Sequence, residues 1–255
     1  MAYPQFQPLH PVHDVLATRR ASDELGLHWP LHRRFTLADG RDEPLGCVRR
    51  PRWRGAVHLI ALCVAVPALT LLIAMARDGR TRLGVAVYAV GLCAMLAAST
   101  TYHRWVHNLR ARAAWRRVDH AMIFAAIAGS VTPIILLTVD SVRGIVLLVA
   151  VWSIAAFGAA LKLGHWHRGD TVGSVLYAAV GVLGGIAIPA LWSQAGAVPG
   201  LLFVASGALY GLGSWWFARS WPRLAPAVFS YHEVWHLLTV AAASTHFVAV
   251  WSIAV

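Results

Sequence analysis

Long apolar stretches follow one another along most of this chain, separated by short polar segments. Seven runs, each close to the ~20 residues that cross a bilayer as a helix, cover roughly 55–76, 83–105, 119–139, 143–163, 171–193, 199–218 and 227–253. The alternation of apolar and polar residues that is typical of membrane β-barrels is absent. The pattern predicts an all-α, polytopic membrane protein with seven transmembrane helices.

The first 52 residues differ in composition from the rest. They hold most of the acidic residues, many basic ones and several prolines, and they contain no apolar run. No short apolar stretch with a small-residue cleavage site behind it is present, so we expect no signal peptide. The sequence therefore predicts two parts: a cytoplasmic, largely disordered basic tail at 1–52 and a seven-helix membrane domain at 53–255.

The distribution of charge orients the predicted helices. Of all residues, 58% are hydrophobic and 13% are charged, which is too little charge to cover a soluble protein of this length. All but four of the 22 Lys and Arg residues fall in the tail or in loops on the same side of the predicted bundle. The positive-inside rule then places the N-terminus in the cytoplasm and the C-terminus outside, and we expect a multi-pass protein of the plasma (cytoplasmic) membrane. A basic face beside anionic lipid accounts for the net charge of +11 without nucleic acid.

Ionisable side chains inside the predicted helices gather at one level. His103 lies near the end of the second helix, Asp119 begins the third, and His232 and His236 lie in the first turns of the seventh. Such groups are costly at membrane depth, so each is a functional candidate. Hydropathy and charge counting alone bring the four to the cytoplasmic leaflet.

Three of these residues suit a metal ion. His232 and His236 are four residues apart and share a helix face, as do Ser99 and His103. Three neutral imidazoles and a water molecule form a tetrahedral zinc site with an exchangeable position. We therefore expect Zn²⁺ to be held by His103, His232 and His236. The alternative is a set of histidines that hydrogen-bond between helices.

Asp119 and Ser99 each have a structural and a functional interpretation. As the first residue of the expected third helix, Asp119 could be its N-cap, or it could hold the water of the metal site and take its proton. Ser99 could be a helix-packing hydroxyl, or it could position water or substrate. We favour the catalytic interpretation of both residues, and for Asp119 the two roles are compatible.

The seventh helix begins with the H-E-x-x-H pattern of zinc proteases. Its Glu233 points about 100° around the helix from the preceding histidine, and Asp119 offers a competing carboxylate. A membrane-embedded protease would need a downstream aspartate ligand, and no Asp or Glu follows His236. These observations argue against a protease, and we expect Glu233 to bind a basic neighbour such as Arg223 or Arg104.

Three separated segments carry motifs of a known family. They are Ser99-x3-His103, Asp119-His120 with Ala128–Pro133, and His232–His236 followed by Ala243–Phe247. In this order and on these helices they resemble the hemolysin III proteins, relatives of the progestin and adipoQ receptors and, more distantly, of the alkaline ceramidases. The resemblance covers residues 53–255 and implies seven helices, a cytoplasmic N-terminus and zinc near the cytoplasmic side. It also implies that the three histidines hold the zinc, with Asp119 bound through water and Ser99 close by. The adiponectin-receptor branch has Gln in place of Glu233, which argues further against an essential glutamate.

Three functions are compatible with this site. The first is a zinc-dependent hydrolase of lipid amides or esters, with Asp119 as base and Ser99 positioning water or substrate. The second is a pore-forming, hemolysin-like protein with structural zinc, and the third is a sensor or membrane-homeostasis receptor. The absence of other charged residues between the predicted membrane ends weakens the pore. We expect the lipid bilayer and a lipid substrate as partners; the sequence does not specify an oligomeric state.

Overall fold

The computed structural model describes residues 35–36, 42–43, 51–106, 109–164, 169–225 and 228–255. Within them, seven helical segments are long and apolar enough to cross a membrane, which confirms the prediction of an all-α, seven-span membrane protein. The helices are α2 (Ala56–Met75), α3 (Gly79–Thr100), α4 (Leu109–Thr138), α5 (Ser141–Leu163), α6 (Gly169–Gly185), α7 (Ile188–Ala195), α8 (Ala197–Ala218) and α9 (Tyr231–Ala254). A π-helical turn, η2 (Thr101–Trp105), continues α3.

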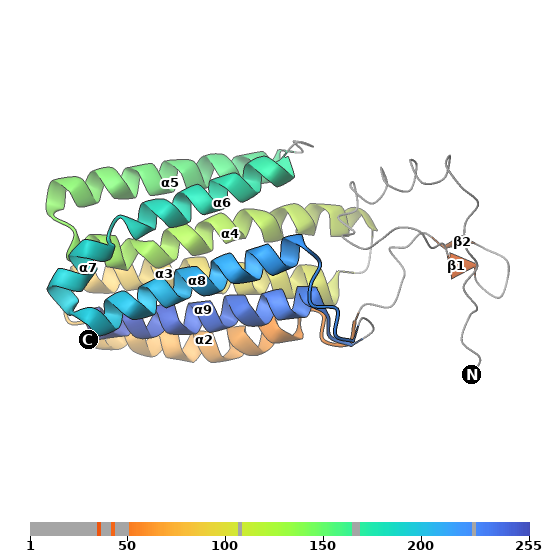
Figure 1. Cartoon of the computed structure of the whole chain (residues 1–255), viewed down its shortest axis with the longest axis horizontal. Helices are drawn as coiled ribbons and strands as arrows, with labels where there is room; N and C mark the ends of the chain where they lie inside the picture. The colour runs from red at the N-terminus through yellow and green to blue at the C-terminus, as the bar shows by residue number, and fades with distance from the viewer. Residues whose placement is uncertain (1–34, 37–41, 44–50, 107–108, 165–168, 226–227) are drawn as a thin grey trace.

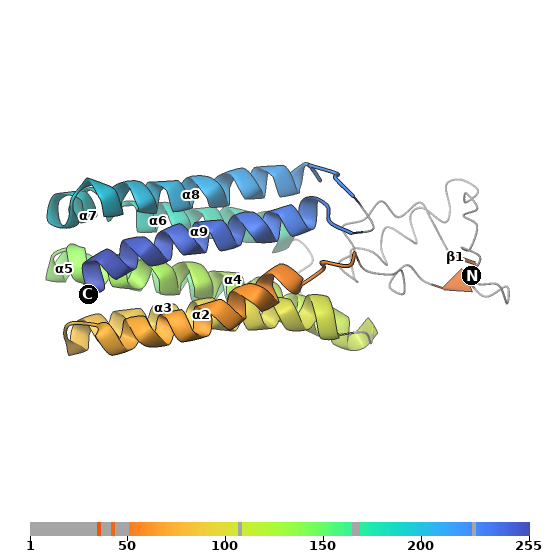
Figure 2. The ribbon, with the colours of Figure 1, turned by 90° about the horizontal axis from the view of Figure 1, so that it is seen from below.

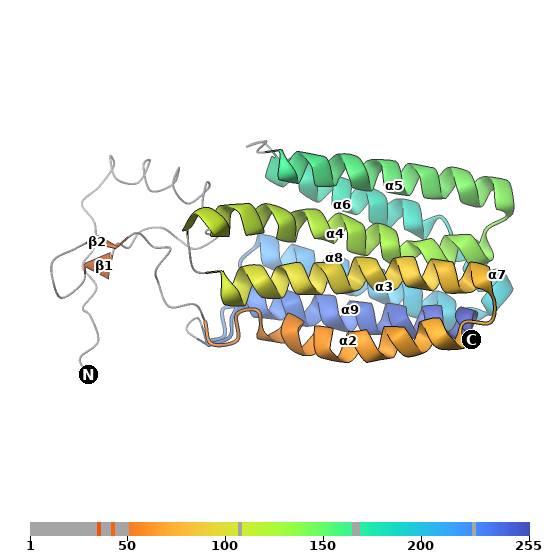
Figure 3. The same ribbon diagram turned by 180° about the vertical axis from the view of Figure 1, so that it is seen from behind.

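The helices lie side by side with their long axes roughly aligned (Figures 1 and 3). The third span, α4, packs against α3, α5, α6 and α9, and α9 in turn packs against α8 and α2. Figure 2 shows α9 running between α8 and α2. We call the end of the bundle at which α2 and α9 begin and α3 finishes the histidine end, because it holds the candidate site.

Close backbone contact joins the second and third spans. A Cβ added at Gly91 of α3 would lie 2.4 Å from the carbonyl oxygen of Ala125 in α4. Tyr88 of α3 is almost fully buried beside this contact, whereas Val90 is 70% exposed. Small residues that let helices approach, with apolar side chains turned outward, are what a bundle in lipid requires. This contact fixes the relative positions of the two helices that lead to Ser99 and Asp119.

The largest boundary difference concerns the third span. We expected it to begin at Asp119, but α4 begins at Leu109, ten residues earlier. The intervening segment is rich in Ala and Arg, which are strong helix formers, and a helix that extends beyond the hydrocarbon core can carry such charges. Asp119 is therefore a residue of the helix interior, and its interpretation as an N-cap is wrong.

Other spans also differ from expectation in their bounds. The predicted fifth span is interrupted, because α6 ends at Gly185 and α7 begins at Ile188 with Pro189 in its first turn. Proline lacks a backbone N–H and suits the first turn of a helix. The last span begins at Tyr231 with Ser230 as its N-cap, four residues later than expected.

The tail at 1–52 lies mostly outside the described residues. Within it, the structure describes residues 51–52 and two short antiparallel strands, β1 (Phe35–Thr36) and β2 (Asp42–Glu43), with Phe35 opposite Glu43. The disorder of the tail, its boundary and the cytoplasmic position of the N-terminus remain predictions.

Candidate metal centre

His103 lies in the π-helical turn that follows α3. The backbone N–H of Val106 donates to the carbonyl oxygen of Thr101 (3.1 Å), which closes the wider turn. Single π-turns of this kind are frequent at functional sites. Gly55, directly before α2, has a left-handed backbone (φ 75°), and a Cβ there would lie 2.9 Å from the Cβ of His103. The glycine therefore lets the start of α2 pack directly against His103.

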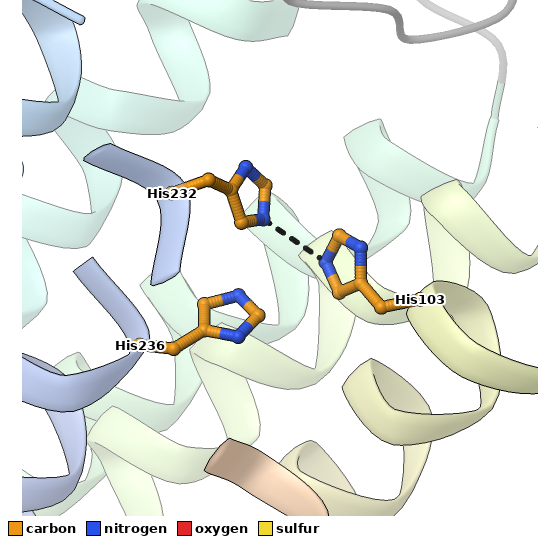
Figure 4. Close-up of side chains that lie close together, drawn as sticks. All are labelled: His103, His232 and His236. Carbon is orange, nitrogen blue, oxygen red and sulfur yellow. Dashed lines mark hydrogen bonds between the residues drawn. The ribbon is translucent and has the colours of Figure 1, made fainter. Parts of the chain in front are cut away.

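His232 and His236 face His103 from the first turns of α9 (Figure 4). The two Nε2 atoms of His103 and His232 lie 3.3 Å apart. Each of the three residues offers a ring nitrogen, and these nitrogens all lie within 4.8 Å of one another. His103 and His236 are buried, and the ring of Phe217 from α8 packs edge-on against His232. The structure thus brings together the three histidines that the sequence singled out.

The spacing of the nitrogens can be compared with that of a metal site and with that of a hydrogen-bonded cluster. Two nitrogens bound to one zinc ion at about 2.05 Å and a tetrahedral angle lie about 3.3 Å apart. A direct hydrogen bond from a ring N–H prefers about 2.9–3.0 Å. The observed 3.3 Å between His103 and His232 matches the first arrangement and also meets the criterion for a long hydrogen bond, so it is compatible with a metal site. Imidazole donors suit zinc and several other divalent transition metals, so the site can hold such an ion.

Asp119 and Ser99 border this group. Asp119 Oδ2 lies 3.7 Å from His103 Nε2, and Ser99 lies near the same carboxyl. Only 7% of Asp119 and 2% of Ser99 are exposed. The carboxyl reaches the site from the third turn of α4, and the hydroxyl reaches it from the last turn of α3. The two predicted catalytic residues therefore lie together beside the histidines.

His58, in the first turn of α2, is a further residue of this site that the sequence analysis missed. Its ring is stacked on that of His236, with centroids 3.9 Å apart and planes 5° from parallel. Its Nδ1 lies 2.8 Å from Ser99 Oγ and its Nε2 lies 3.1 Å from Thr239 Oγ1. The argument from membrane depth that identified His103 applies equally to this first-turn histidine.

Glu233 points away from the three histidines. One carboxylate oxygen accepts the Nε–H of Arg54, and the other accepts the backbone N–H of Ser230 at 2.8 Å. The expectation of a basic partner is confirmed, but the partner is Arg54, from the segment before α2, rather than Arg223 or Arg104. Because both oxygens are engaged in an ion pair and a capping box, the glutamate has a structural role at the start of α9.

His246 is buried farther along α9. Its Nε2 lies 2.8 Å from the carbonyl oxygen of Ser130 in α4, and its ring packs against Tyr88 and Phe203. This histidine joins α9 to α4 and lies outside the group of three.

Seven membrane spans with a buried three-histidine group between the second and the last define a heptahelical membrane protein with a candidate intramembrane metal centre. The sequence model of the family described as "Haemolysin-III related" matches residues 48–247, and the chain belongs to this family. Hemolysin-3 of Bacillus cereus is 29% identical over 196 residues, which are 76% of this chain and 86% of that protein. The Hemolysin-3 homolog of Bacillus subtilis (strain 168) is 28% identical over 197 residues, or 76% and 89% of the two chains.

A plant protein extends the similarity. The heptahelical transmembrane protein ADIPOR2 of Oryza sativa subsp. japonica is 30% identical over 182 residues, which cover 64% of this chain and 79% of that protein. Both the hemolysin III resemblance and the relation to adiponectin-receptor-like proteins are confirmed.

Proposed function

We propose that this protein is a zinc-dependent membrane hydrolase that cleaves an amide or ester bond of a lipid. The observation that carries the proposal is the buried carboxyl of Asp119 beside three imidazole donors, with its Oδ2 3.7 Å from His103 Nε2. Three neutral ligands and a separate carboxylate are the arrangement of a catalytic zinc site rather than a closed structural one.

His103, His232 and His236 would hold the ion. A zinc ion in this position would polarise a carbonyl group and activate a water molecule for attack. Asp119 takes a proton from the attacking water, because its carboxylate borders the space that the three histidines face. Ser99 lies near this carboxyl on the neighbouring helix, where it would position water or substrate. Glu233 is not available as the base, since Arg54 and the backbone of Ser230 occupy its two oxygens.

The depth of the site favours a lipid as the substrate. The histidines lie at the ends of membrane-spanning helices, so we expect them near the level where the polar interface of a bilayer meets its hydrocarbon core. The amide and ester carbonyls of membrane lipids lie at this same boundary. The excess of basic residues near this end supports a cytoplasmic position of the site, in the plasma membrane of the cell.

A pore-forming role with a structural metal is the second candidate, because two of the relatives carry the name Hemolysin-3. A water-filled pore needs polar residues along its length. Among the described residues, the buried acidic side chains, Asp119 and Glu233, both lie at the histidine end, whereas the buried polar side chains farther along the bundle are hydroxyls and His246. The position of the carboxylates supports a local reaction site over a path lined by acidic residues.

Exchanging Asp119 for asparagine tests the proposal. In purified protein in lipid nanodiscs, Asp119→Asn keeps the bound metal and lowers lipid hydrolysis by about 10²–10⁴-fold, the usual contribution of a general base. Asp140→Asn is the matched control, because Asp140 caps the exposed start of α5 at the other end of the bundle and asparagine also caps well. Unchanged hydrolysis in Asp119→Asn contradicts the assignment. Liposome leakage by the wild type, without hydrolysis of any lipid amide or ester, supports the pore.

A further inference from the structure

We infer that His58 is a positioning residue of the metal centre: it fixes the ring plane of His236 and orients the Ser99 hydroxyl through a hydrogen bond. The inference rests on the metal centre proposed above and assigns a function to the first span, α2. Three contacts carry it, and they come from one side chain that is 4% exposed.

The ring stack acts on His236. The imidazoles of His58 and His236 lie face to face, with centroids 3.9 Å apart and an angle of 5° between their planes. A ring covered in this way cannot turn about its Cβ–Cγ bond without losing the contact. Groups that orient a ligand ring commonly change metal affinity by about 10–100-fold when they are removed. His58 thus contributes to metal binding without being a ligand.

The hydrogen bonds act on Ser99. The hydroxyl of Thr239 donates to the carbonyl oxygen of His236 (2.8 Å), so its single proton is used and its oxygen accepts from His58 Nε2, 3.1 Å away. The neutral ring then carries its proton on Nε2, and its Nδ1 is an acceptor for the hydroxyl of Ser99 at 2.8 Å. The hydroxyl of Ser99 therefore donates to Nδ1 of His58, which fixes its direction.

His58 is not required to hold α2 in the bundle. The ion pair between Arg54 and Glu233 and the backbone hydrogen bond from Trp53 N–H to the carbonyl oxygen of Val228 (3.2 Å) also tie the start of α2 to the start of α9. A substitution at His58 should leave these two connections intact. Its effects on metal binding and on hydrolysis can therefore be measured in a folded protein.

Two substitutions separate the two contributions. His58→Ala removes the stack and both hydrogen bonds, whereas His58→Phe keeps a flat ring over His236 and removes only the hydrogen bonds. The control is His246→Ala. His246 is another buried histidine, and it lies on α9 about 15 Å from His236 along the helix axis. Zn²⁺ affinity is measured by chelator competition in nanodiscs, and the visible spectrum of the Co²⁺-substituted protein reports the ligand geometry.

We expect His58→Ala to raise the Zn²⁺ dissociation constant at least about tenfold and to shift the Co²⁺ bands. His58→Phe should stay within about threefold of the wild type in Zn²⁺ affinity but lose at least about tenfold in hydrolysis. His246→Ala should match the wild type in Zn²⁺ affinity and spectrum. If His58→Ala does not fold, unchanged hydrolysis in His58→Phe still overturns the assignment.

Failure of this inference differs from failure of the metal centre. If the wild type binds Zn²⁺ and His58→Ala has the same affinity and Co²⁺ spectrum, the positioning role of His58 is wrong and the metal centre stands. If the wild type does not bind Zn²⁺ or Co²⁺, both the metal centre and the positioning role of His58 are wrong.

Discussion

The substitution Glu233→Gln separates a structural glutamate from a catalytic one. Glutamine has the same shape and can still accept the N–H of Ser230, so the cap at the start of α9 is retained. What is lost is the negative charge opposite Arg54. Because Glu233 is 0% and Arg54 is 18% exposed in their side chains, the arginine is left largely buried and without this partner.

The expected loss of folding stability in Glu233→Gln follows from this burial. Removing one partner of a fully buried ion pair costs about 3–5 kcal/mol, and losing one charged hydrogen bond costs about 1.5–3 kcal/mol. The partial exposure of Arg54 lets water solvate part of its charge, so we expect the lower range, about 2 kcal/mol. For a domain of this size the corresponding fall in melting temperature is about 4–8 °C.

The assay compares stability with metal binding and activity. Thermal unfolding in nanodiscs should show the lower melting temperature, while Zn²⁺ content and hydrolysis at 25 °C stay near those of the wild type. Arg54→Gln provides the partner variant, and combining it with Glu233→Gln should cost clearly less than the sum of the two single effects. A fall in hydrolysis of 10²-fold or more with an unchanged melting temperature would instead identify Glu233 as a general base, as in a zinc protease, and would refute our assignment.

Two glycines provide further predictions. Gly55→Ala should lower the free energy of unfolding by about 1–2 kcal/mol and weaken Zn²⁺ binding, because φ at this residue is +75° and the added Cβ would press on His103. Thermal unfolding measures the first effect, and chelator competition measures the second. Gly91→Ala should lower the melting temperature by several degrees through the clash with the carbonyl oxygen of Ala125, an effect of about 1–3 kcal/mol. Gly207→Ala, which meets nothing within 4 Å, is the control for both, and equal melting temperatures in all three variants would contradict the packing argument.

Hydropathy and charge predicted the spans and the level of the site. Each apolar run corresponds to a membrane span because lipid requires a continuous apolar helix of fixed length. The same rule does not define where a helix ends outside the hydrocarbon core. The ten residues before Asp119 are basic and helical, and hydropathy alone could not distinguish them from a loop.

The chemical pattern of the site was partly visible in the sequence. His232 and His236 share a helix face, and motif order linked them to His103. His58 has no such spacing to any of them, and its contacts with Ser99 and Thr239 arise only when α2, α3 and α9 pack together. The partner of Glu233 is likewise 179 residues away in the chain, so nearby arginines were more conspicuous than Arg54.

Metal analysis of the purified protein tests the central claim most directly. The account predicts about one zinc ion per chain in the wild type, as expected for three imidazole ligands, a value near zero in His236→Ala, and the wild-type value in His246→Ala. A wild-type protein without bound metal, or a His236→Ala variant that retains the full amount, would contradict it.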